Sequence, residues 1–273
     1  MSSAPPSLPL RGGVLLPSVG LGVFRTPGGE TRRVVRDALA CGYRHIDTAR
    51  IYGNEAEVAA AVRDSGLPRA EVFVTTKVWN DDQGYEATLR AVDASLARMK
   101  LESVDLVLLH WPVAGRRLDA WRALERLHAD GKARAIGVSN FMVPHLQELL
   151  GVCREPPSVN QVELSPFLQQ RDVRALCAPH GIVVEAYSPL TKGVRLTHPV
   201  LGQVAAAVGR TPAQVLLRWG LQHGLVVLPK STRPARLAEN LAALDFALPP
   251  EAMDRLDGLE EGLVTGWDPR GVP

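Results

Sequence analysis

The chain has 273 residues, 46% of them hydrophobic and 22% charged, and its formal net charge is +2. These values describe a globular protein with a large core, and the small net charge argues against a nucleic-acid partner or a membrane surface. The three cysteines lie far apart and form no Cys-x-x-Cys pair, which argues against a disulfide framework and favours the reducing cytoplasm.

The first part of the chain predicts a small hairpin. Residues 1–9 are rich in serine and proline and lack the basic and apolar segments of a signal peptide, so we expect them to be flexible. Residues 8–10 and 14–17, joined by Arg11-Gly12-Gly13, predict an N-terminal β-hairpin. No apolar run approaches the roughly 20 residues that a membrane helix needs.

After this hairpin, short apolar segments alternate with segments of helical periodicity. The predicted strands cover residues 19–24, 43–46, 72–76, 104–109, 133–138, 159–162, 182–185 and 225–228. The predicted helices cover residues 30–41, 55–64, 85–99, 118–129, 143–150, 172–178, 199–208, 212–223 and 235–242. Several of the strands are nearly continuous apolar runs, which is typical of strands buried on both faces.

A chain of this length with eight strand and helix units and no linker predicts an α/β fold of one domain. We expect residues 1–273 to form a single (β/α)8 TIM barrel with an N-terminal β-hairpin. Residues 243–273 would form a C-terminal tail near the barrel mouth. A doubly wound sheet is the second possibility.

Polar residues follow nearly every predicted strand, at the end where barrel enzymes carry their active sites. In chain order they are Asp47, Lys77, His110, Ser139, Asn140, Gln161, Glu163, Tyr187, Ser188, Lys230 and Ser231. Because the carboxyl ends of parallel strands open on the same face, we expect these side chains to converge on one mouth.

Tyr52 follows Asp47 closely and suggests proton-transfer chemistry. A tyrosine is a poor acid near neutral pH because its reference pKa is about 10. A nearby cation would lower that pKa, and Lys77, held by the Asp47 carboxylate, is the cation that we expect. His110 could hydrogen-bond a substrate carbonyl oxygen and orient it.

These four residues, in this order on successive strands, resemble the catalytic tetrad of the aldo-keto reductase family. Seven segments are similar to motifs of that family and follow in its order, from Gly20 to Asn240: GYRHIDTARIYGNE, TTKVWN, LLHWP, AIGVSNF, SVNQVELSPF, EAYSPL and LPKSTRPARLAEN. Among its members, the chain resembles prokaryotic-type enzymes such as diketogluconate and methylglyoxal reductases.

The resemblance implies an NADPH-dependent oxidoreductase that transfers a hydride to an aldehyde or ketone and yields an alcohol, with no metal. Tyr52 would be the general acid, and Lys77, in a salt bridge with Asp47, would lower its pKa. His110 would place the carbonyl group.

The resemblance also implies where the cofactor binds. A helix start with lysine and arginine residues is typical of a phosphate site, and one follows the last predicted strand, which favours NADPH over NADH. Arg233 in that segment would touch phosphate or only solvent. The implied contacts are Ser139, Asn140, Gln161 and Tyr187 for the nicotinamide, Ser188, Leu190 and Lys192 for the pyrophosphate, Lys230, Ser231, Thr232 and Arg236 for the 2′-phosphate, and Glu239 and Asn240 for the adenine.

Four aromatic residues are the expected substrate contacts: Phe24, Trp79, Trp111 and Trp267. Core packing is an equally open role for Trp79 and Trp111. The loop after the fourth strand and the C-terminal tail are short compared with the family pattern, which implies an open pocket. An open pocket favours small carbonyl compounds such as dicarbonyls, keto acids or keto esters.

Other interpretations have less support. The sequence has no GxGxxG after a first strand, no HExxH and no GxSxG, which argues against a Rossmann site, a metalloprotease and a hydrolase. A catalytically weak NADP(H)-binding sensor is the alternative function. For Arg44, His45 and Arg50 we expect surface or packing roles. We expect a cytoplasmic monomer whose partner is its small-molecule substrate.

Overall fold

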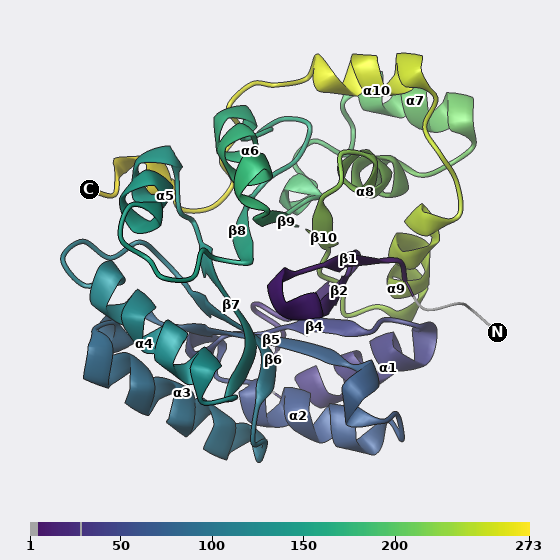
Figure 1. The fold of residues 1–273 in the computed structure, drawn as a ribbon. Coiled ribbons are helices and arrows are strands. Elements are labelled where there is room, and N and C mark those ends of the chain that lie inside the picture. The colour runs from purple at the N-terminus through teal and green to yellow at the C-terminus, as the bar shows by residue number, and fades with distance from the viewer. Residues whose placement is uncertain (1–4, 28) are drawn as a thin grey trace.

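The computed structural model of the protein describes residues 5–27 and 29–273, and its centre is a sheet of eight parallel strands (Figure 1). Each strand pairs with the next one along the chain, which confirms the barrel and not the doubly wound sheet. The strands are β3 (Leu21–Gly22), β4 (His45–Asp47), β5 (Phe73–Val78), β6 (Val104–Leu109), β7 (Ala133–Ser139), β8 (Val159–Glu163), β9 (Val183–Tyr187) and β10 (Val226–Leu228).

The barrel closes between its first and last strands. Val19 forms a parallel bridge with Val227, just before β3 begins. The amide of Gly20 donates to the carbonyl of Val227 at 2.9 Å, and the amide of Val227 donates to the carbonyl of Ser18 at 2.9 Å. Regular pairing in the first strand therefore covers only two residues of the predicted range 19–24, and single backbone bonds complete the circle.

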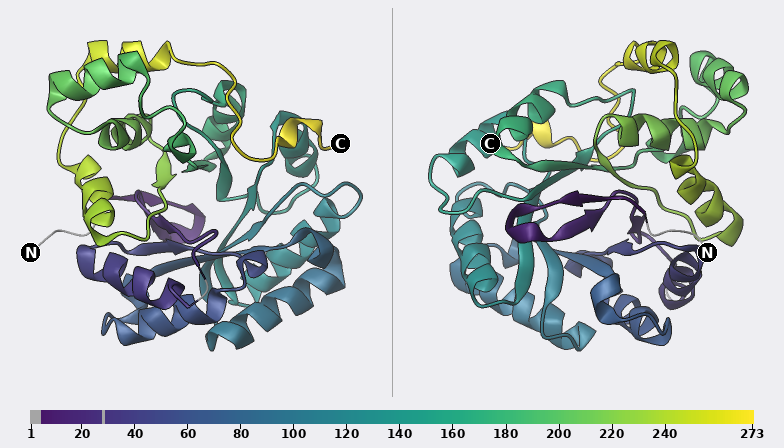
Figure 2. Two further views of the ribbon diagram at one scale, coloured as in Figure 1. Left: turned by 180° about the vertical axis from the view of Figure 1, so that it is seen from behind. Right: turned by 45° about the vertical axis from the view of Figure 1, so that its right-hand side comes forward.

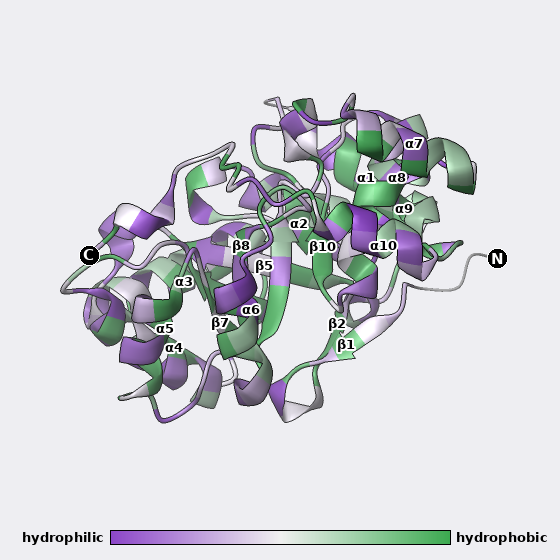
Figure 3. Cartoon of the chain, turned by 90° about the horizontal axis from the view of Figure 1, so that it is seen from above, coloured by the Kyte–Doolittle hydropathy of each residue, from purple (hydrophilic) through white to green (hydrophobic). Residues whose placement is uncertain are grey.

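Helices surround the barrel on its outside (Figure 2). They are α1 (Thr31–Cys41), α2 (Glu55–Asp64), α3 (Tyr85–Met99), α4 (Arg117–Ala129), α5 (Val143–Leu150), α6 (Arg171–Cys177), α7 (Pro199–Val208), α8 (Pro212–Gln222), α9 (Pro234–Leu241) and α10 (Pro250–Asp257). The central strands are largely hydrophobic, whereas the helices carry both hydrophobic and hydrophilic positions (Figure 3). In the part of the chain that the structure describes, no helix has the length and apolar character to cross a bilayer.

Helix α1 illustrates how the sequence builds each unit. Its buried face includes Val34, Val35, Ala38 and Leu39, which recur at helical spacing. Gly42 ends the helix with a φ of 116°, a value that side-chain-bearing residues rarely adopt, and its amide donates to two carbonyls of the last turn. The chain then turns directly into β4. Helix α10, by contrast, was not predicted, because we expected residues 243–273 to form a C-terminal tail.

The hairpin of β1 (Ser7–Pro9) and β2 (Leu15–Pro17) closes the end of the barrel at which the strands begin. Its Leu10, Val14 and Leu16 pack in one buried cluster with inward-facing strand residues such as Phe73 and Leu106. The hairpin is therefore confirmed, and Ser7–Pro9 lie in a paired strand although we expected residues 1–9 to be flexible. Residues 1–4 of that range lie outside the described residues.

The barrel interior changes from apolar to polar toward the carboxyl ends of the strands. Alternate residues of a strand point to the same face, so Phe73, Thr75 and Lys77 succeed one another on the inner face of β5. The same progression occurs on other strands: Leu106, Leu108 and His110 on and after β6; Ala135, Gly137 and Ser139 on β7; Val159, Gln161 and Glu163 on β8; and Val183, Glu185 and Tyr187 on β9. The barrel interior is thus apolar where the strands begin and polar from its middle to their carboxyl ends.

Candidate active site

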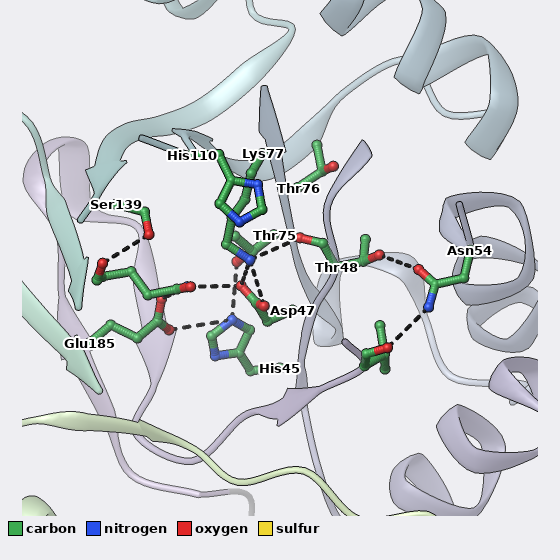
Figure 4. Close-up of polar contacts among 12 residues, drawn as sticks. His45, Asp47, Thr48, Asn54, Thr75, Thr76, Lys77, His110, Ser139 and Glu185 are labelled. Carbon is green, nitrogen blue, oxygen red and sulfur yellow. Dashed lines mark hydrogen bonds and ion pairs between the residues drawn. The ribbon is translucent and has the colours of Figure 1, made fainter. Parts of the chain in front are cut away.

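A buried ion pair joins β4 to β5 at the mouth. The ammonium of Lys77 donates to Asp47 Oδ1 at 2.6 Å, to Asp47 Oδ2 at 2.7 Å and to the carbonyl of Thr48 at 3.1 Å (Figure 4). Lys77 is only 1% exposed and Asp47 3%. Burial opposes the charge of Lys77, but the carboxylate of Asp47 raises the pKa of the ammonium above its ordinary value. Lys77 therefore remains a cation within the barrel.

Tyr52 lies beside this cation, in the short 3-10 turn Arg50–Tyr52 that follows β4. The ammonium of Lys77 lies 5.2 Å from the centre of its ring. Burial raises the pKa of the Tyr52 hydroxyl above its ordinary value, and Lys77 acts in the opposite direction. The expected lowering by Lys77 is thus present, but in this structure burial outweighs it. A phenol with a raised pKa carries its proton at neutral pH, as a proton donor must.

The loop that carries Tyr52 is fixed by hydrogen bonds that the sequence analysis did not identify. Thr48 Oγ1 donates to Asn54 Oδ1 at 2.6 Å, and Asn54 Nδ2 donates to the carbonyl of Val23 at 3.2 Å (Figure 4). Gly53 adopts a φ of 70° directly after Tyr52. The loop is therefore tied both to β4 and to the segment after β3.

His110 follows β6 and faces Tyr52 and Trp79 with the edge-to-face geometry that aromatic rings prefer. Its ring centre lies 5.8 Å from that of Tyr52 and 5.2 Å from that of Trp79. Burial, and then the charge of Lys77, lower the pKa of His110 well below its ordinary value. The imidazole is therefore neutral at pH 7, and its Nδ1 has no hydrogen-bond partner among the described residues.

Four polar residues that we expected near a nicotinamide form one connected group. Ser139 Oγ donates to the carbonyl of Gln161 at 2.9 Å, and Asn140 Nδ2 donates to the carbonyl of His110 at 2.9 Å. The hydroxyl of Tyr187 donates to Asn140 Oδ1 at 2.8 Å, which fixes the tyrosine ring at the mouth. Ser139, Asn140 and Gln161 are all buried.

The loop after β9 has an unusual backbone. Ser188, Thr191 and Lys192 have φ values of 49°, 51° and 50°, in the left-handed region that side-chain-bearing residues rarely occupy. Such strain is concentrated at ligand sites, because the surrounding structure must maintain it. Leu190 packs partly buried against the core in this loop. The ammonium of Lys192, however, donates to the carbonyl of Thr265 at 2.6 Å and so binds the C-terminal tail in this structure.

The expected 2′-phosphate site lies between β10 and α9. Lys230, Arg233 and Arg236 are exposed there, and none of the three forms a salt bridge with any described residue. Ser231 is buried, and its hydroxyl accepts from the amide of Arg233 at 3.1 Å. Thr232 is partly buried beside them.

The two residues that we expected at the adenine differ from each other. The carboxylate of Glu239 accepts a hydrogen bond from Thr211 Oγ1 at 2.6 Å, so it is already engaged by the first residue before α8. Asn240 is buried, at 3% exposure.

The four expected substrate contacts are called the aromatic rim below: Phe24, Trp79, Trp111 and Trp267. Phe24 and Trp79 pack on rings of the tetrad. Phe24 packs on Tyr52 with ring centres 4.9 Å apart, and it is 49% exposed. Trp111 and Trp267 pair at 5.9 Å, which brings the C-terminal tail to the mouth. Trp267 is 70% exposed, so this rim is open to solvent on one side.

Comparison with known proteins decides the family of a chain with this geometry. The sequence profile described as the aldo/keto reductase family matches residues 18–261. The chain belongs to the aldo/keto reductase family. This confirms the family resemblance drawn from the tetrad and its motifs, and the family carries out NADPH-dependent carbonyl reduction.

Individual members are closely similar. The 9,11-endoperoxide prostaglandin H2 reductase of Trypanosoma cruzi (strain CL Brener) is 50% identical over 264 residues, which cover 95% of this chain and 93% of the relative. The glyoxal reductase of Bacillus subtilis (strain 168) is 49% identical over 261 residues, 95% of each chain. The crystal structure of a variant of Gox0644 in complex with NADPH matches with a TM-score of 0.93 and 41% identity, over 99% of this chain and 100% of that one.

Two buried polar residues near the ion pair of this aldo/keto reductase are not among the predicted site residues. Glu185 lies on β9 and His45 on β4, and both are completely buried near Asp47 and Lys77 (Figure 4). Complete burial of His45 agrees with a packing role, one of the two roles that we expect for it, and not with a surface role. A signal for Glu185 was present, because an acidic residue in the apolar segment of residues 182–187 is unusual for a strand buried on both faces.

Proposed function

We propose that the protein reduces small aldehydes and ketones to alcohols, with NADPH as the hydride donor and Tyr52 as the general acid. The observation that carries this proposal is the ion pair of Lys77 and Asp47 beneath the ring of Tyr52, with neutral His110 facing the same ring. This arrangement offers two hydrogen-bonding groups to a single carbonyl oxygen. One of them can give up its proton.

Each of the four tetrad residues would have its own role in carbonyl reduction. When bound, NADPH supplies the hydride. Neutral His110 orients the carbonyl oxygen, and Tyr52 then donates its hydroxyl proton to that oxygen as negative charge develops there. Lys77 stabilises the phenolate left on Tyr52, because its positive charge lies 5.2 Å from the ring centre. Asp47 holds the ammonium in place by accepting two of its hydrogen bonds.

The donor set at the mouth fits a nicotinamide cofactor. Ser139, Asn140 and Gln161 present polar groups at the level of the tetrad, and the ring of Tyr187 is held beside them by its bond to Asn140. The exposed cations of the segment after β10 would hold a 2′-phosphate at the other end. The assignment of Ser188, Leu190 and Lys192 to the pyrophosphate also stays a prediction.

Small and polar carbonyl compounds suit the aromatic rim best. Phe24 is 49% exposed and Trp267 70%, so they would cover a substrate from one side without enclosing it. The similarity to a glyoxal reductase supports dicarbonyl substrates. Keto acids and keto esters of similar size are the other candidates.

The proposal predicts that the purified protein consumes NADPH when glyoxal, methylglyoxal or a short β-keto ester is added. Loss of absorbance at 340 nm measures the rate, and chromatography identifies the alcohol product. The alternative function, an NADP(H)-binding sensor with little turnover, predicts tight NADPH binding without consumption across the same panel. Binding without any consumption would therefore overturn the enzyme assignment in favour of the sensor.

A second prediction concerns the cofactor's phosphate. Arg236→Ala should raise the Kd for NADPH about tenfold or more and change that for NADH less than twofold, because a charge-assisted bond to phosphate contributes about 1.5–3 kcal/mol. Tryptophan fluorescence titration measures both constants. Arg122→Ala, at an exposed arginine on α4 that pairs with Asp119, is the matched control and should change neither constant. Equal losses for both cofactors would contradict the 2′-phosphate assignment.

The expected monomeric state and cytoplasmic location stay predictions.

A further inference from the structure

A second buried carboxyl group lies beneath the catalytic ion pair and has no part in the mechanism given above. Glu185 is completely buried on the inner face of β9. Its Oε2 accepts a hydrogen bond from Gln161 Nε2 at 2.6 Å. The same nitrogen of Gln161 donates to Asp47 Oδ2 at 2.9 Å. One side-chain amide therefore bridges two carboxyl groups, one of them the anchor of Lys77.

This bridge determines how the Gln161 amide presents itself. An amide nitrogen carries two hydrogens, and each is directed to a different carboxyl group here. The amide oxygen, Oε1, accepts no hydrogen bond from any described residue. It is consequently available to a ligand at the mouth, and the ligand group it suits is an N–H donor such as a carboxamide NH2.

The positions of Asp47 and Glu185 explain why the Gln161 amide needs both partners. Asp47 alone would orient the nitrogen of Gln161, since a carboxylate repels an amide oxygen, but one bond leaves the amide free to rotate about it. Glu185 supplies the second fixed point from the neighbouring strand, where β8 and β9 pair Gln161 directly with Glu185. Two bonds from two strands fix the plane of the amide.

The charge of Glu185 is consistent with this arrangement. The groups that face it are Asp47 and His45 from β4, Lys77 from β5 and Gln161 from β8. Burial, and then the negative charge of Asp47, raise the pKa of Glu185 to about 8. His45 cannot offset this, because burial lowers its pKa to about 3 and leaves it neutral. Lys77 therefore faces one carboxylate at neutral pH, and Glu185 accepts from Gln161 as a neutral acid.

We propose that Glu185 is a positioning residue, which acts with Asp47 to hold the Gln161 amide oxygen toward the carboxamide of the bound nicotinamide. This inference rests on the proposed function, since it concerns the cofactor site named there. It gives Glu185 a part in cofactor orientation beside that expected for Tyr187 on the same strand.

The test compares the binding of two ligands to the parent protein and to two variants of Glu185. Glu185→Leu should raise the Kd for NADPH about tenfold, because one hydrogen bond that orders the amide is lost. It should leave the Kd for 2′-phospho-ADP-ribose, which lacks the nicotinamide, within twofold of the parent value. Glu185→Gln retains an oxygen that can accept from Gln161, and it should keep both constants within twofold. Isothermal titration calorimetry measures all of them.

A double variant separates positioning from general damage to the core. In a Gln161→Leu background, adding Glu185→Leu should change the Kd for NADPH less than twofold, because its intermediary is already absent. Equal weakening of NADPH and 2′-phospho-ADP-ribose by Glu185→Leu, or a full effect in the Gln161→Leu background, would overturn the inference. So would a tenfold loss in Glu185→Gln. Failure of the parent protein to bind NADPH would instead overturn the proposed function.

Discussion

Tyr52→Phe is expected to lower kcat for carbonyl reduction by a factor of about 100 to 10,000, the usual contribution of a positioned general acid. The substitution removes only the phenolic hydroxyl. It keeps the ring that packs against Phe24 at 4.9 Å and lies near the Lys77 ammonium. The Kd for NADPH should therefore stay within about twofold of the parent value. Steady-state kinetics with methylglyoxal and a fluorescence titration measure the two quantities.

A surface tyrosine provides the control for this substitution. Tyr85 begins α3 and is 37% exposed, so Tyr85→Phe removes the same hydroxyl where no chemistry is expected. It should leave kcat unchanged. If Tyr52→Phe kept more than about a tenth of the parent kcat, another group would have to deliver the proton. His110 would then be examined first, although its depressed pKa makes it a poor acid at neutral pH.

Lys77→Met should both stop reduction and destabilise the fold. Removing the cation leaves the carboxylate of Asp47, which is 3% exposed, without its partner inside the barrel. Breaking a buried ion pair in this way costs about 3–5 kcal/mol, because the remaining charge is buried and uncompensated. Urea denaturation followed by circular dichroism measures the free energy of unfolding of the variant and the parent.

The chain contains a matched ion pair at the surface. Lys132 Nζ lies 2.6 Å from Asp93 Oδ1, the same separation as between Lys77 and Asp47, but its side chain is 37% exposed and that of Asp93 51%. Lys132→Met should cost less than about 1 kcal/mol, since water solvates the remaining carboxylate. Equal losses for the two variants would show that burial does not strengthen the pair at the mouth.

Combining Asp47→Asn with Lys77→Met tests whether the uncompensated carboxylate causes the loss of stability. The double variant removes both charges, so the uncompensated carboxylate no longer exists. Its loss of stability should be clearly smaller than the sum of the two single losses, as expected for residues in direct contact. Strict additivity would indicate that the cost arises from packing and not from charge.

Much of the clustering of the candidate site could be predicted because it follows from local rules. An apolar strand places the next polar residue at the mouth, and this rule located Asp47, Lys77 and His110 without knowledge of any distance. Tyr52 followed from its short separation from Asp47. The order of the strands along the chain then made these residues neighbours.

What could not be predicted depends on contacts across the barrel. Glu185 is linked to Asp47 through the amide of Gln161, and this link joins the neighbouring strands β8 and β9 to β4, whose Asp47 lies 114 residues from Gln161 in the chain. The balance of burial against the charge of Lys77 at Tyr52 likewise depends on the depth of the hydroxyl, which sequence does not give. Helix α10 is a different case, because Ala252, Met253 and Leu256 do recur at helical spacing and the helix could have been predicted.

The N-terminal hairpin, which closes one end of the barrel, affects the order in which ligands bind and leave. Because the amino end of the barrel is covered, cofactor and substrate must both enter at the carboxyl ends of the strands. The polar groups suited to a nicotinamide lie at the level of Gln161 and Tyr187, whereas the aromatic rim with Trp267 lies outside them. We therefore expect NADPH to bind before the carbonyl compound, and the alcohol to leave before NADP+.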